Sequence, residues 1–204
     1  MIYLYGASGH AKVIIEIFER QQRKIAGLID VNPAITALLN YPVYPSLKDS
    51  SFNDEMELVL SIGNNAIRKK LAEQIKVKYT TAIHPSANIS TRAVIVEGTV
   101  VMSGVSVNSD ATIGQHVILN TNCSVDHDCI INDFVHISPN AVIAGNVSVG
   151  EGTHIGIGAC IIQGIKIGKW ATIGAGAVII NDVPDYAVVV GNPGKIIKYN
   201  KPDN

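Results

Sequence analysis

The sequence predicts two folds in one chain: a small Rossmann-like α/β domain of βαβαβ order over residues 1–82, followed by a parallel β-helix over residues 83–204. The first prediction rests on short apolar strands that alternate with amphipathic helices. The second rests on branched aliphatic residues that recur at every sixth position without a slip. The change of period marks the expected boundary between the two domains.

The N-terminal domain is expected to hold a small parallel sheet. Strands are expected at residues 2–5, 25–29 and 58–62, and helices at residues 11–22 and 66–75. Open sheets of this kind bind ligands beyond the carboxyl ends of their strands. The intervening stretch 32–53 contains Pro33, Pro42 and Pro45 and is expected to be an irregular surface connection.

The C-terminal domain is expected to bury one aliphatic side chain in every repeat. The aliphatic positions run from Ile83 to Ile179 in steps of six, and a small or β-branched residue follows each of them four positions later. Such a repeat is typical of a parallel β-helix, in which each coil packs its aliphatic residues against the coils above and below. Cys123 and Cys129 occupy the small position, so we interpret them as packing residues without a redox role.

The composition favours a small-molecule role. Lys and Arg number 16 against 17 Asp and Glu, so we expect neither a nucleic-acid partner nor a membrane partner. Three cysteines without a C-x-x-C spacing indicate a reducing, cytoplasmic location. The N-terminal residues lack the basic region of a signal peptide, and no uninterrupted apolar segment reaches the length of a membrane span.

A polar cluster interrupts the aliphatic array at residues 123–138. His127 occupies the third position of the repeat that starts at Val125, where a side chain is expected to point out of the coil, and Asp126 and Asp128 flank it. A solvated polar face would explain a lone repeat of this kind. However, a neutral imidazole accepts a proton near pH 7, and a carboxylate bonded to its other ring nitrogen stabilises the imidazolium that forms. The cluster is therefore a candidate general base with an acidic partner.

A glycine-containing turn follows the first expected strand. Gly6-Ala7-Ser8-Gly9-His10 falls short of the G-x-G-x-x-G fingerprint, and a tight connection from strand to helix would explain it. Bare backbone amides at the start of a helix also suit a phosphate or a nucleotide. The turn is therefore a candidate ligand site at the edge of the sheet.

The chain resembles the nucleotide-amino-sugar N-acetyltransferases of the hexapeptide-repeat class, a group that includes relatives of the bacillosamine-pathway enzyme and of the sialic acid O-acetyltransferases. The repeats from Ile83 to about Tyr199 carry the resemblance, together with the motifs Tyr5–His10 and Ser61–Arg68. It implies a left-handed β-helix with three-sided coils, acetyl-coenzyme A (acetyl-CoA) as co-substrate and no metal. The other substrate would be an amino-deoxy sugar linked to UDP, dTDP or GDP. A homotrimer with each site between two chains, and a role in surface-glycan biosynthesis, are also implied.

The resemblance assigns roles to individual residues. It places the catalytic base at His127 and the acidic partner at Asp128, while Asp126 competes for the pairing role. The residues assigned to the nucleotide-sugar are Ser8, Gly9, His10, Asp30 and Gly63. The residues assigned to acetyl-CoA are Asn120, His136, Gly145, Ile157 and Ala175.

This chain departs from the pattern of its relatives at several of these positions. Asp128 stands where relatives often have glutamate, and Ala175 stands where they have glycine. Val31 follows Asp30 where relatives carry a second acidic residue. Lys195, which follows the turn at residues 191–194, is interpreted either as a contact for coenzyme A phosphates or as a solvated lysine of the tail.

Three other interpretations are open at this point. An O-acetyltransferase would use the same base on a hydroxyl group, such as one of a sialic acid. A zinc site resembling that of the β-helix carbonic anhydrases would need three imidazoles from the set His116, His127, His136 and His154. A non-enzymatic β-helix scaffold would need neither the ligand-binding edge nor the histidine–aspartate pair.

Overall fold

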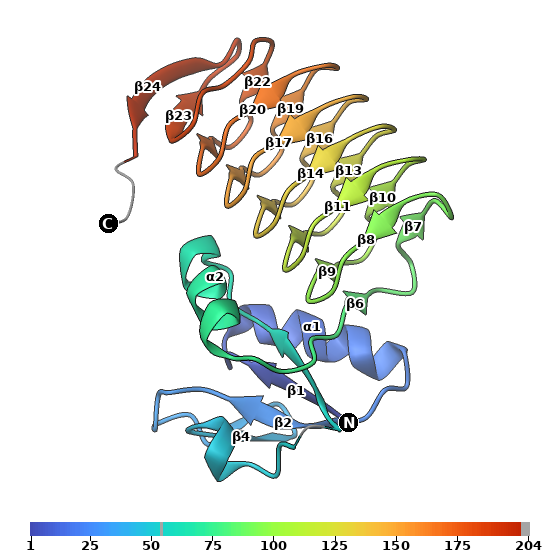
Figure 1. Cartoon of the computed structure of the whole chain (residues 1–204), viewed down its shortest axis with the longest axis vertical. Helices are drawn as coiled ribbons and strands as arrows, with labels where there is room; N and C mark the ends of the chain where they lie inside the picture. Colours follow the sequence, from blue (N-terminus) through green and yellow to red (C-terminus); the bar gives the residue numbers. More distant parts are fainter. Residues whose placement is uncertain (54, 201–204) are drawn as a thin grey trace.

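The computed structural model describes residues 1–53 and 55–200. An α/β domain is followed by a long stack of short strands, which ends in the hairpin of β23 (Ala187–Val190) and β24 (Lys195–Tyr199) (Figure 1). The fold class predicted from the sequence, a Rossmann-like domain followed by a left-handed parallel β-helix, is confirmed. Within the described ranges, no helix is both long and apolar enough to cross a bilayer.

Five strands form the sheet of the α/β domain, in the order β3-β4-β2-β1-β5. Their bounds are Ile2–Tyr5 for β1, Ile25–Ile29 for β2, Ala37–Leu38 for β3, Tyr41–Tyr44 for β4 and Glu57–Leu60 for β5. β1 pairs in parallel with both β2 and β5. The chain moves outward from β1 to β2 and then returns to β5 on the other side of β1, so the carboxyl ends of β1 and β5 border the crevice where such sheets bind ligands.

The stretch 32–53 is more regular than the sequence suggested. It forms the antiparallel pair β3–β4 and a short 3-10 helix at Leu47–Asp49, and β4 adds to the main sheet by pairing in parallel with β2. Pro42 comes before Val43 and Tyr44, the two residues of β4 that pair with β2, so the missing N–H of proline falls outside that pairing. The expectation of an irregular connection was wrong, because β-branched and aromatic residues such as Val43 and Tyr44 extend the sheet in spite of the prolines.

Two helices cover opposite sides of the sheet. Helix α1 (Gly9–Arg20) packs on the side that carries Ile2 and Leu4, while α2 (Asn65–Gln74) packs through Leu71 on the side that carries Tyr3. This separation follows from the alternation of side chains along a strand. The side chain of Asn64 caps α2 by accepting the backbone N–H of Ile67 at 3.0 Å, so α2 begins after the short turn that follows β5.

The β-helix has three faces, each a sheet of short parallel strands, which we name after their first strand. The β6 face holds β6 Ala82–Ile83, β9 Val100–Val101, β12 Ile118–Leu119, β15 His136–Ile137, β18 His154–Ile155 and β21 Thr172–Ile173, followed by β23 and β24. The β7 face holds β7 Asn88–Ile89, β10 Ser106–Val107, β13 Ser124–Val125, β16 Val142–Ile143, β19 Cys160–Ile161 and β22 Val178–Ile179. The β8 face holds β8 Val94–Ile95, β11 Thr112–Ile113, β14 Ile130–Ile131, β17 Ser148–Val149 and β20 Lys166–Ile167.

Three turns per coil join these faces at three vertices. The first vertex lies between the β6 and β7 faces, the second between the β7 and β8 faces, and the third between the β8 and β6 faces. Neighbouring coils are in register, so that Val125 pairs with Ile143 and Ile137 with Ile155. Residues 18 positions apart therefore lie one above the other in successive coils.

The aliphatic position of each repeat fills the interior of the coil. Ile143 is fully buried in this core, between the equally buried Val125 and the 2 % exposed Ile161 of the adjacent coils. Replacing Ile143 with alanine is expected to lower the free energy of unfolding by about 2–5 kcal/mol, because the loss of buried methylenes leaves a cavity. Urea denaturation measures this change; Arg92→Ala, at an exposed turn, should change the same free energy by less than about 0.5 kcal/mol.

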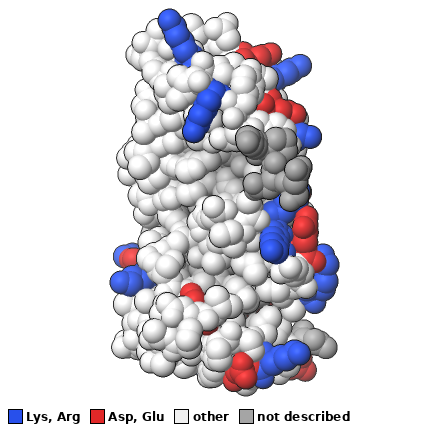
Figure 2. All heavy atoms as spheres, turned by 90° about the vertical axis from the view of Figure 1, so that its left-hand side faces the viewer, with Lys and Arg blue, Asp and Glu red and all other residues white. Residues whose placement is uncertain are grey.

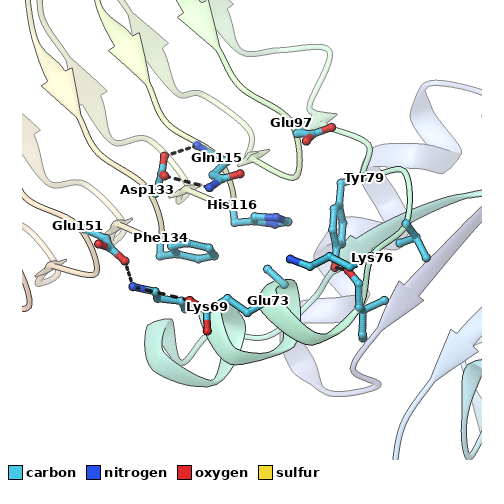
Figure 3. Close-up of a pocket in the computed structure, with 13 residues that line it drawn as sticks. Lys69, Glu73, Lys76, Tyr79, Glu97, Gln115, His116, Asp133, Phe134 and Glu151 are labelled. Atoms are coloured by element: carbon cyan, nitrogen blue, oxygen red, sulfur yellow. Dashed lines mark hydrogen bonds and ion pairs between the residues drawn. The ribbon is translucent and has the colours of Figure 1, made fainter. Parts of the chain in front are cut away.

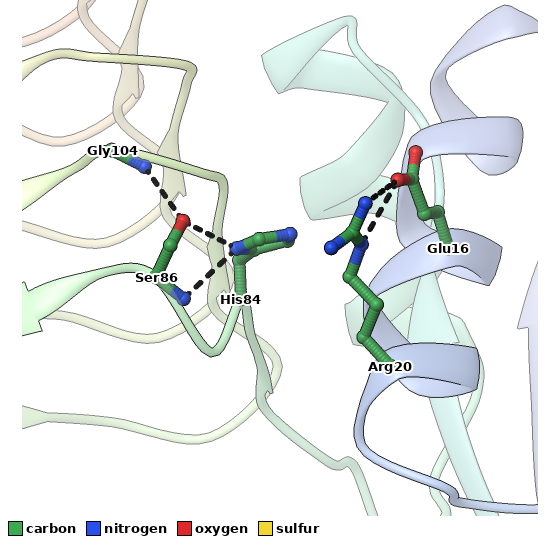
Figure 4. A network of polar contacts seen from close by, with 5 residues as sticks. All are labelled: Glu16, Arg20, His84, Ser86 and Gly104. Atoms are coloured by element: carbon green, nitrogen blue, oxygen red, sulfur yellow. Dashed lines mark hydrogen bonds and ion pairs between the residues drawn. The ribbon is translucent and has the colours of Figure 1, made fainter.

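The α/β domain packs against the β6 face. Outward-facing Val100, Met102 and Ile118 of that face are buried in one cluster with the apolar side of α1. At the same junction, Figure 4 shows the His84 ring between the first coil and Arg20 of α1, with the Ser86 hydroxyl and backbone amide 2.7 and 3.0 Å from His84 Nδ1. The apolar contact therefore fixes the α/β domain on one side of the triangular coil.

Candidate active site

His127 and Asp128 form a hydrogen-bonded pair at the second vertex, in the turn after β13. His127 Nδ1 lies 2.7 Å from Asp128 Oδ2, and the two side chains are 59 % and 61 % exposed. Because Asp128 accepts a hydrogen from Nδ1, the neutral ring keeps its lone pair on Nε2, the nitrogen that a general base uses. Asp128 has φ +57°, a conformation that aspartate tolerates better than most residues. The pair predicted from the sequence is therefore present in a geometry suited to proton transfer.

Asp126 orients the turn and does not pair with the imidazole. Its Oδ1 accepts the backbone N–H of His127 at 2.8 Å and an amide N–H of Asn108, one coil earlier, at 2.7 Å. The competing hypothesis, in which Asp126 pairs with the imidazole, is not the arrangement in this structure. A hollow of about 390 Å³ opens beside these residues, lined by Ser90 and Asn108 as well as by His127.

The two aspartates raise the pKa of His127 above its ordinary value, chiefly through the Asp128 hydrogen bond and next through the charge of Asp126. A raised pKa makes the imidazole a stronger base but demands a higher pH to keep it neutral. The hydrogen bond from Asn108 is the main cause that lowers the pKa of Asp126. Both carboxylates are thus placed to stabilise an imidazolium.

Gly145 lies directly beneath the His127 ring, 18 positions further along the chain. A Cβ at this glycine would approach His127 Cε1 and Nε2 to 2.6 Å, which is closer than a real contact allows. The role of Gly145 as a contact for acetyl-CoA stays a prediction. The structure adds a second reason for glycine, because any side chain here would displace the imidazole.

The residues predicted to bind the nucleotide-sugar gather at the carboxyl ends of β1, β2 and β5. Ser8 and Gly9 are exposed at the start of α1, and Gly63 is exposed in the turn after β5. A Cβ at Gly9 or Gly63 would meet nothing within 4 Å, so no neighbouring side chain requires glycine at either position. Their backbone amides are accessible to a ligand, as expected at the N-terminus of a helix.

Asp30 closes this edge from the end of β2. Its Oδ2 accepts the backbone N–H of Ala7 at 2.8 Å, and its Oδ1 accepts that of Asn32 at 2.9 Å. Each carboxylate oxygen retains a further lone pair for a ligand. Asp30 therefore shapes the turn at Ala7 and can also bind a hydroxyl group of a ligand there.

His10 and His136 lie near each other where the α/β domain packs against the β6 face, close enough for His10 to lower the pKa of His136. His136 Nε2 lies 3.1 Å from the side-chain amide nitrogen of Asn120, and its ring stacks on His154 at 4.8 Å with 3° between the planes. Burial, then the neighbouring His154 and then the charge of Arg68 lower the pKa of His136 to about 3, while the backbone of Gly63 acts in the opposite direction. Burial likewise lowers the pKa of His10 to about 4. These imidazoles are neutral near pH 7.

The predicted acetyl-CoA contacts do not all lie together in one chain. Asn120, Ile157 and Ala175 lie at the first vertex, and the backbone N–H of Gly176 next to Ala175 donates to Ile157 at 2.8 Å. Ile157 is 58 % exposed. Asn120 also joins this group to His136, but Gly145 lies at the second vertex with His127.

The four histidines of the zinc hypothesis do not form a metal site. His136 stacks on His154, whereas His127 is bonded to Asp128 at the second vertex and His116 packs at the third vertex, 5.3 Å from the Phe134 ring. Among residues 1–53 and 55–200, no group of three or more His, Cys, Asp or Glu side chains is arranged to hold a metal ion.

Another hollow, of about 450 Å³, lies between the third vertex on one side and α2 with the following residues 75–79 on the other, and it was not foreseen from the sequence. Figure 3 shows His116 and Phe134 on its β-helix side, facing Tyr79, Lys69 of α2 and Lys76, which follows that helix. Apart from His116 of the zinc hypothesis, none of the predicted site residues lines it.

Three contacts that were not predicted from the sequence join residues 18 positions apart. Gly145 follows His127 by 18 positions, His154 follows His136 by 18, and Asp126 follows its partner Asn108 by 18. This spacing is one full coil, as the strand register confirms. A search of the sequence at a period of 18, in addition to 6, would have identified all three pairs.

Comparisons with known proteins agree with this architecture. Residues 1–75 match the family described as PglD N-terminal domain. A stretch of 110 residues is 37 % identical to the UDP-N-acetylbacillosamine N-acetyltransferase of Bacillus subtilis (strain 168), and the match spans 50 % of this chain and 51 % of that protein. The chain thus spans about half the length of this curated relative.

Solved structures match over almost the whole chain. PerB from Caulobacter crescentus, in complex with CoA and GDP-perosamine, is 36 % identical with a TM-score of 0.88, and the match covers 97 % of each chain. The acetyltransferase domain of PglB from Neisseria gonorrhoeae FA1090 is 36 % identical with a TM-score of 0.91, covering 96 % of this chain and 98 % of that one. The chain therefore belongs to the PglD-type family of hexapeptide-repeat sugar N-acetyltransferases.

Proposed function

We propose that this protein transfers an acetyl group from acetyl-CoA to the primary amine of a nucleotide-linked amino-deoxy sugar. The hydrogen-bonded pair of His127 and Asp128 at 2.7 Å is the observation that carries the proposal. Family membership supports the reaction class, since the Caulobacter relative was solved with CoA and GDP-perosamine. The sugar would enter surface-glycan biosynthesis.

In the proposed mechanism, the neutral amine of the substrate attacks the carbonyl carbon of the thioester, and His127 Nε2 takes a proton from the nitrogen as the C–N bond forms, directly or through a water molecule. The tetrahedral intermediate then collapses, the C–S bond breaks, and coenzyme A leaves as the thiol. Asp128 holds the proton on Nδ1 and stabilises the imidazolium that forms. A nearby carboxylate therefore favours the role of His127 as general base. The proton on His127 is available to the leaving sulfur.

A single chain cannot bring its own base to its own nucleotide-binding edge. In a three-sided coil the second vertex, with His127, lies opposite the β6 face, and the α/β domain packs on that face. A second copy of the chain would have to present its second vertex to the seam between the α/β domain and the β6 face. This geometry supports the expected homotrimer with each site between two chains.

The outer surface of the β-helix also supports association. Val94, Ile130 and Val142 on the β8 and β7 faces are 54 %, 53 % and 45 % exposed. Figure 2 shows a broad surface of the molecule on which charged side chains lie mainly at the edges and ends. Apolar side chains of this size, exposed on flat strands, are typical of surfaces that pack against another chain.

Acetyl-CoA would bind between the first vertex of one chain and the second vertex of its neighbour. The exposed Ile157 and Ala175 offer an apolar strip along successive coils that fits the pantetheine chain. His136, joined to Asn120, would contact the acetyl end near Gly63. In this arrangement, Gly145 of the neighbouring chain borders both the cofactor and His127.

Asp30→Ala is expected to raise the KM for the nucleotide-sugar by roughly 10-fold or more, because a charge-assisted hydrogen bond contributes about 1.5–3 kcal/mol. The KM for acetyl-CoA should stay within about twofold, since Asp30 lies on the α/β domain. Steady-state kinetics with each substrate varied in turn measures both values. An effect limited to acetyl-CoA would contradict the division of substrates between the domains, and Asp49→Ala, on the exposed 3-10 helix, is the matched control.

A panel of acceptors tests the reaction. Purified protein would be mixed with acetyl-CoA and nucleotide-linked 3- or 4-amino-dideoxy sugars, with sugars that carry a hydroxyl in place of the amine as controls, and release of the coenzyme A thiol would be followed. Release with one amino sugar alone is the expected outcome. Release only with a hydroxyl acceptor such as a sialic acid would overturn the proposal and establish an O-acetyltransferase.

A further inference from the structure

Arg68 on α2 is a fully buried cation, and every one of its N–H groups has a partner. It is 1 % exposed. Its five hydrogen bonds equal the number of N–H groups on a guanidinium, and all five acceptors are neutral oxygens. The ion pairs found among the described residues do not include Arg68. Burying a charge without a counter-ion is costly, so this arrangement needs an explanation.

The five acceptors belong to both domains. Within the α/β domain, Arg68 Nη1 donates to the carbonyls of Ile62 at 2.9 Å and Gly63 at 3.3 Å. Within the β-helix, Nε donates to the carbonyl of His116 at 2.8 Å and Nη2 to that of Phe134 at 2.9 Å. One side chain thus connects the turn after β5 to two stacked turns of the third vertex.

Neighbouring side chains of α2 extend this connection to a third coil. Asn65 Oδ1 accepts the remaining N–H of Arg68 at 2.9 Å, and its amide nitrogen donates to the carbonyl of Gly152 at 3.0 Å. His116, Phe134 and Gly152 are 18 residues apart, so they occupy the same place in three successive coils. Figure 3 shows that Lys69, on the same helix, also reaches the β-helix through Glu151.

The connected turns flank the proposed reaction centre. Phe134 lies two residues before His136, and Gly63 is the turn predicted to bind the sugar. The backbone of Gly63 also acts on the pKa of His136, which it raises against the effect of burial. The charge of Arg68 contributes to lowering the pKa of His10, His136 and His154, although burial is the larger cause for each. A change at Arg68 therefore affects both the α/β domain and the β-helix at their contact.

We propose that Arg68 is a positioning residue that sets the nucleotide-sugar edge of the α/β domain against the strand carrying His136, and thereby aligns the sugar amine with the acetyl group. This inference rests on the proposed function. Arg68 touches neither substrate, so its removal should leave the binding of each ligand almost intact and slow the reaction between them. A misplacement of about 1 Å between reacting groups costs on the order of 100-fold in rate.

The test compares Arg68→Lys, which keeps the charge but not the five-bond geometry, with Arg23→Lys. Arg23 also lies near the domain junction, but it bonds to Glu57 at 2.5 Å and Thr80 at 3.0 Å, away from the histidines. Arg68→Lys should lower kcat by about 10- to 100-fold, while the dissociation constants for CoA and for the free nucleoside diphosphate change by less than about threefold. Arg23→Lys should retain kcat. Full kcat in Arg68→Lys, or a loss explained wholly by weaker binding of one ligand, would overturn the proposal.

Hydrogen–deuterium exchange gives a readout that does not depend on turnover. In Arg68→Lys, amide exchange should quicken in segments 61–65 and 132–136 and stay unchanged in coils beyond residue 160. The milder variant Asn65→Ala should quicken exchange in the same segments by a smaller factor, which covers the case in which Arg68→Lys folds poorly. Unchanged exchange in both variants would refute the positioning role. Faster exchange in the variants, together with a wild-type protein that shows no acetyl transfer, would refute the proposed function alone.

Discussion

The variant His127→Ala is expected to turn over roughly 10²- to 10⁴-fold more slowly than wild type, which is the usual cost of losing a general base. The dissociation constant for CoA should be nearly unchanged, because His127 is more than half exposed and contributes no packing to the coil. Turnover near the wild-type value would contradict the assignment of the base.

The pH dependence of kcat/KM provides a second readout for the same pair. His127 must be neutral to accept a proton, so activity falls as the pH drops through its pKa, which Asp128 and then Asp126 raise. Asp128→Asn removes the larger cause, so the acid limb should move to lower pH while kcat falls. Asp126→Asn should move the limb in the same direction by less and preserve most of kcat. An acid limb that stays in place in Asp128→Asn would show that His127 is not the titrating base.

Gly145→Ala is expected to lower kcat by on the order of 100-fold, because the new methyl group would push the His127 ring out of position. The variant should lose kcat but keep a thermal stability close to that of the wild type, since the His127 ring lies on the exposed side of the turn. Circular dichroism melting and steady-state kinetics measure the two quantities.

A double-mutant cycle separates this effect from a contact with acetyl-CoA. If Gly145 acts by leaving room for the imidazole, Gly145→Ala should have almost no further effect on kcat in the His127→Ala background. If Gly145 acts only as a contact for acetyl-CoA, Gly145→Ala should raise the KM for acetyl-CoA equally in both backgrounds. The second pattern would contradict the steric role.

The six-residue period was sufficient to predict the β-helix, because every aliphatic position from Val101 to Ile179 is buried in one continuous core. The pairing of His127 with Asp128 was also predictable, since neighbouring residues in a short turn must lie close together. The role of Asp126 was harder to predict, because its partner Asn108 lies a full coil earlier in the sequence.

Neither the six-residue period nor the 18-residue period of the β-helix predicts the contacts between the two domains. Arg68 lies on α2, four residues after its cap Asn64, and nothing in its local pattern distinguishes it from the neighbouring Lys69 and Lys70. Only the docking of α2 on the third vertex buries its guanidinium against His116 and Phe134. Likewise β4 joins the sheet because tertiary pairing with β2 outweighs the local preference of Pro42 for a loop.

The central claim is that the acetyl group moves to an amine, and the chemical nature of the product tests it most directly. The product formed with a nucleotide-linked amino sugar would be isolated and treated briefly with alkaline hydroxylamine, which cleaves oxygen esters and spares amides. We expect a product heavier by one acetyl group that resists this treatment and no longer has a free amine. An acetyl group released by hydroxylamine, with the amine still free, would contradict N-acetylation.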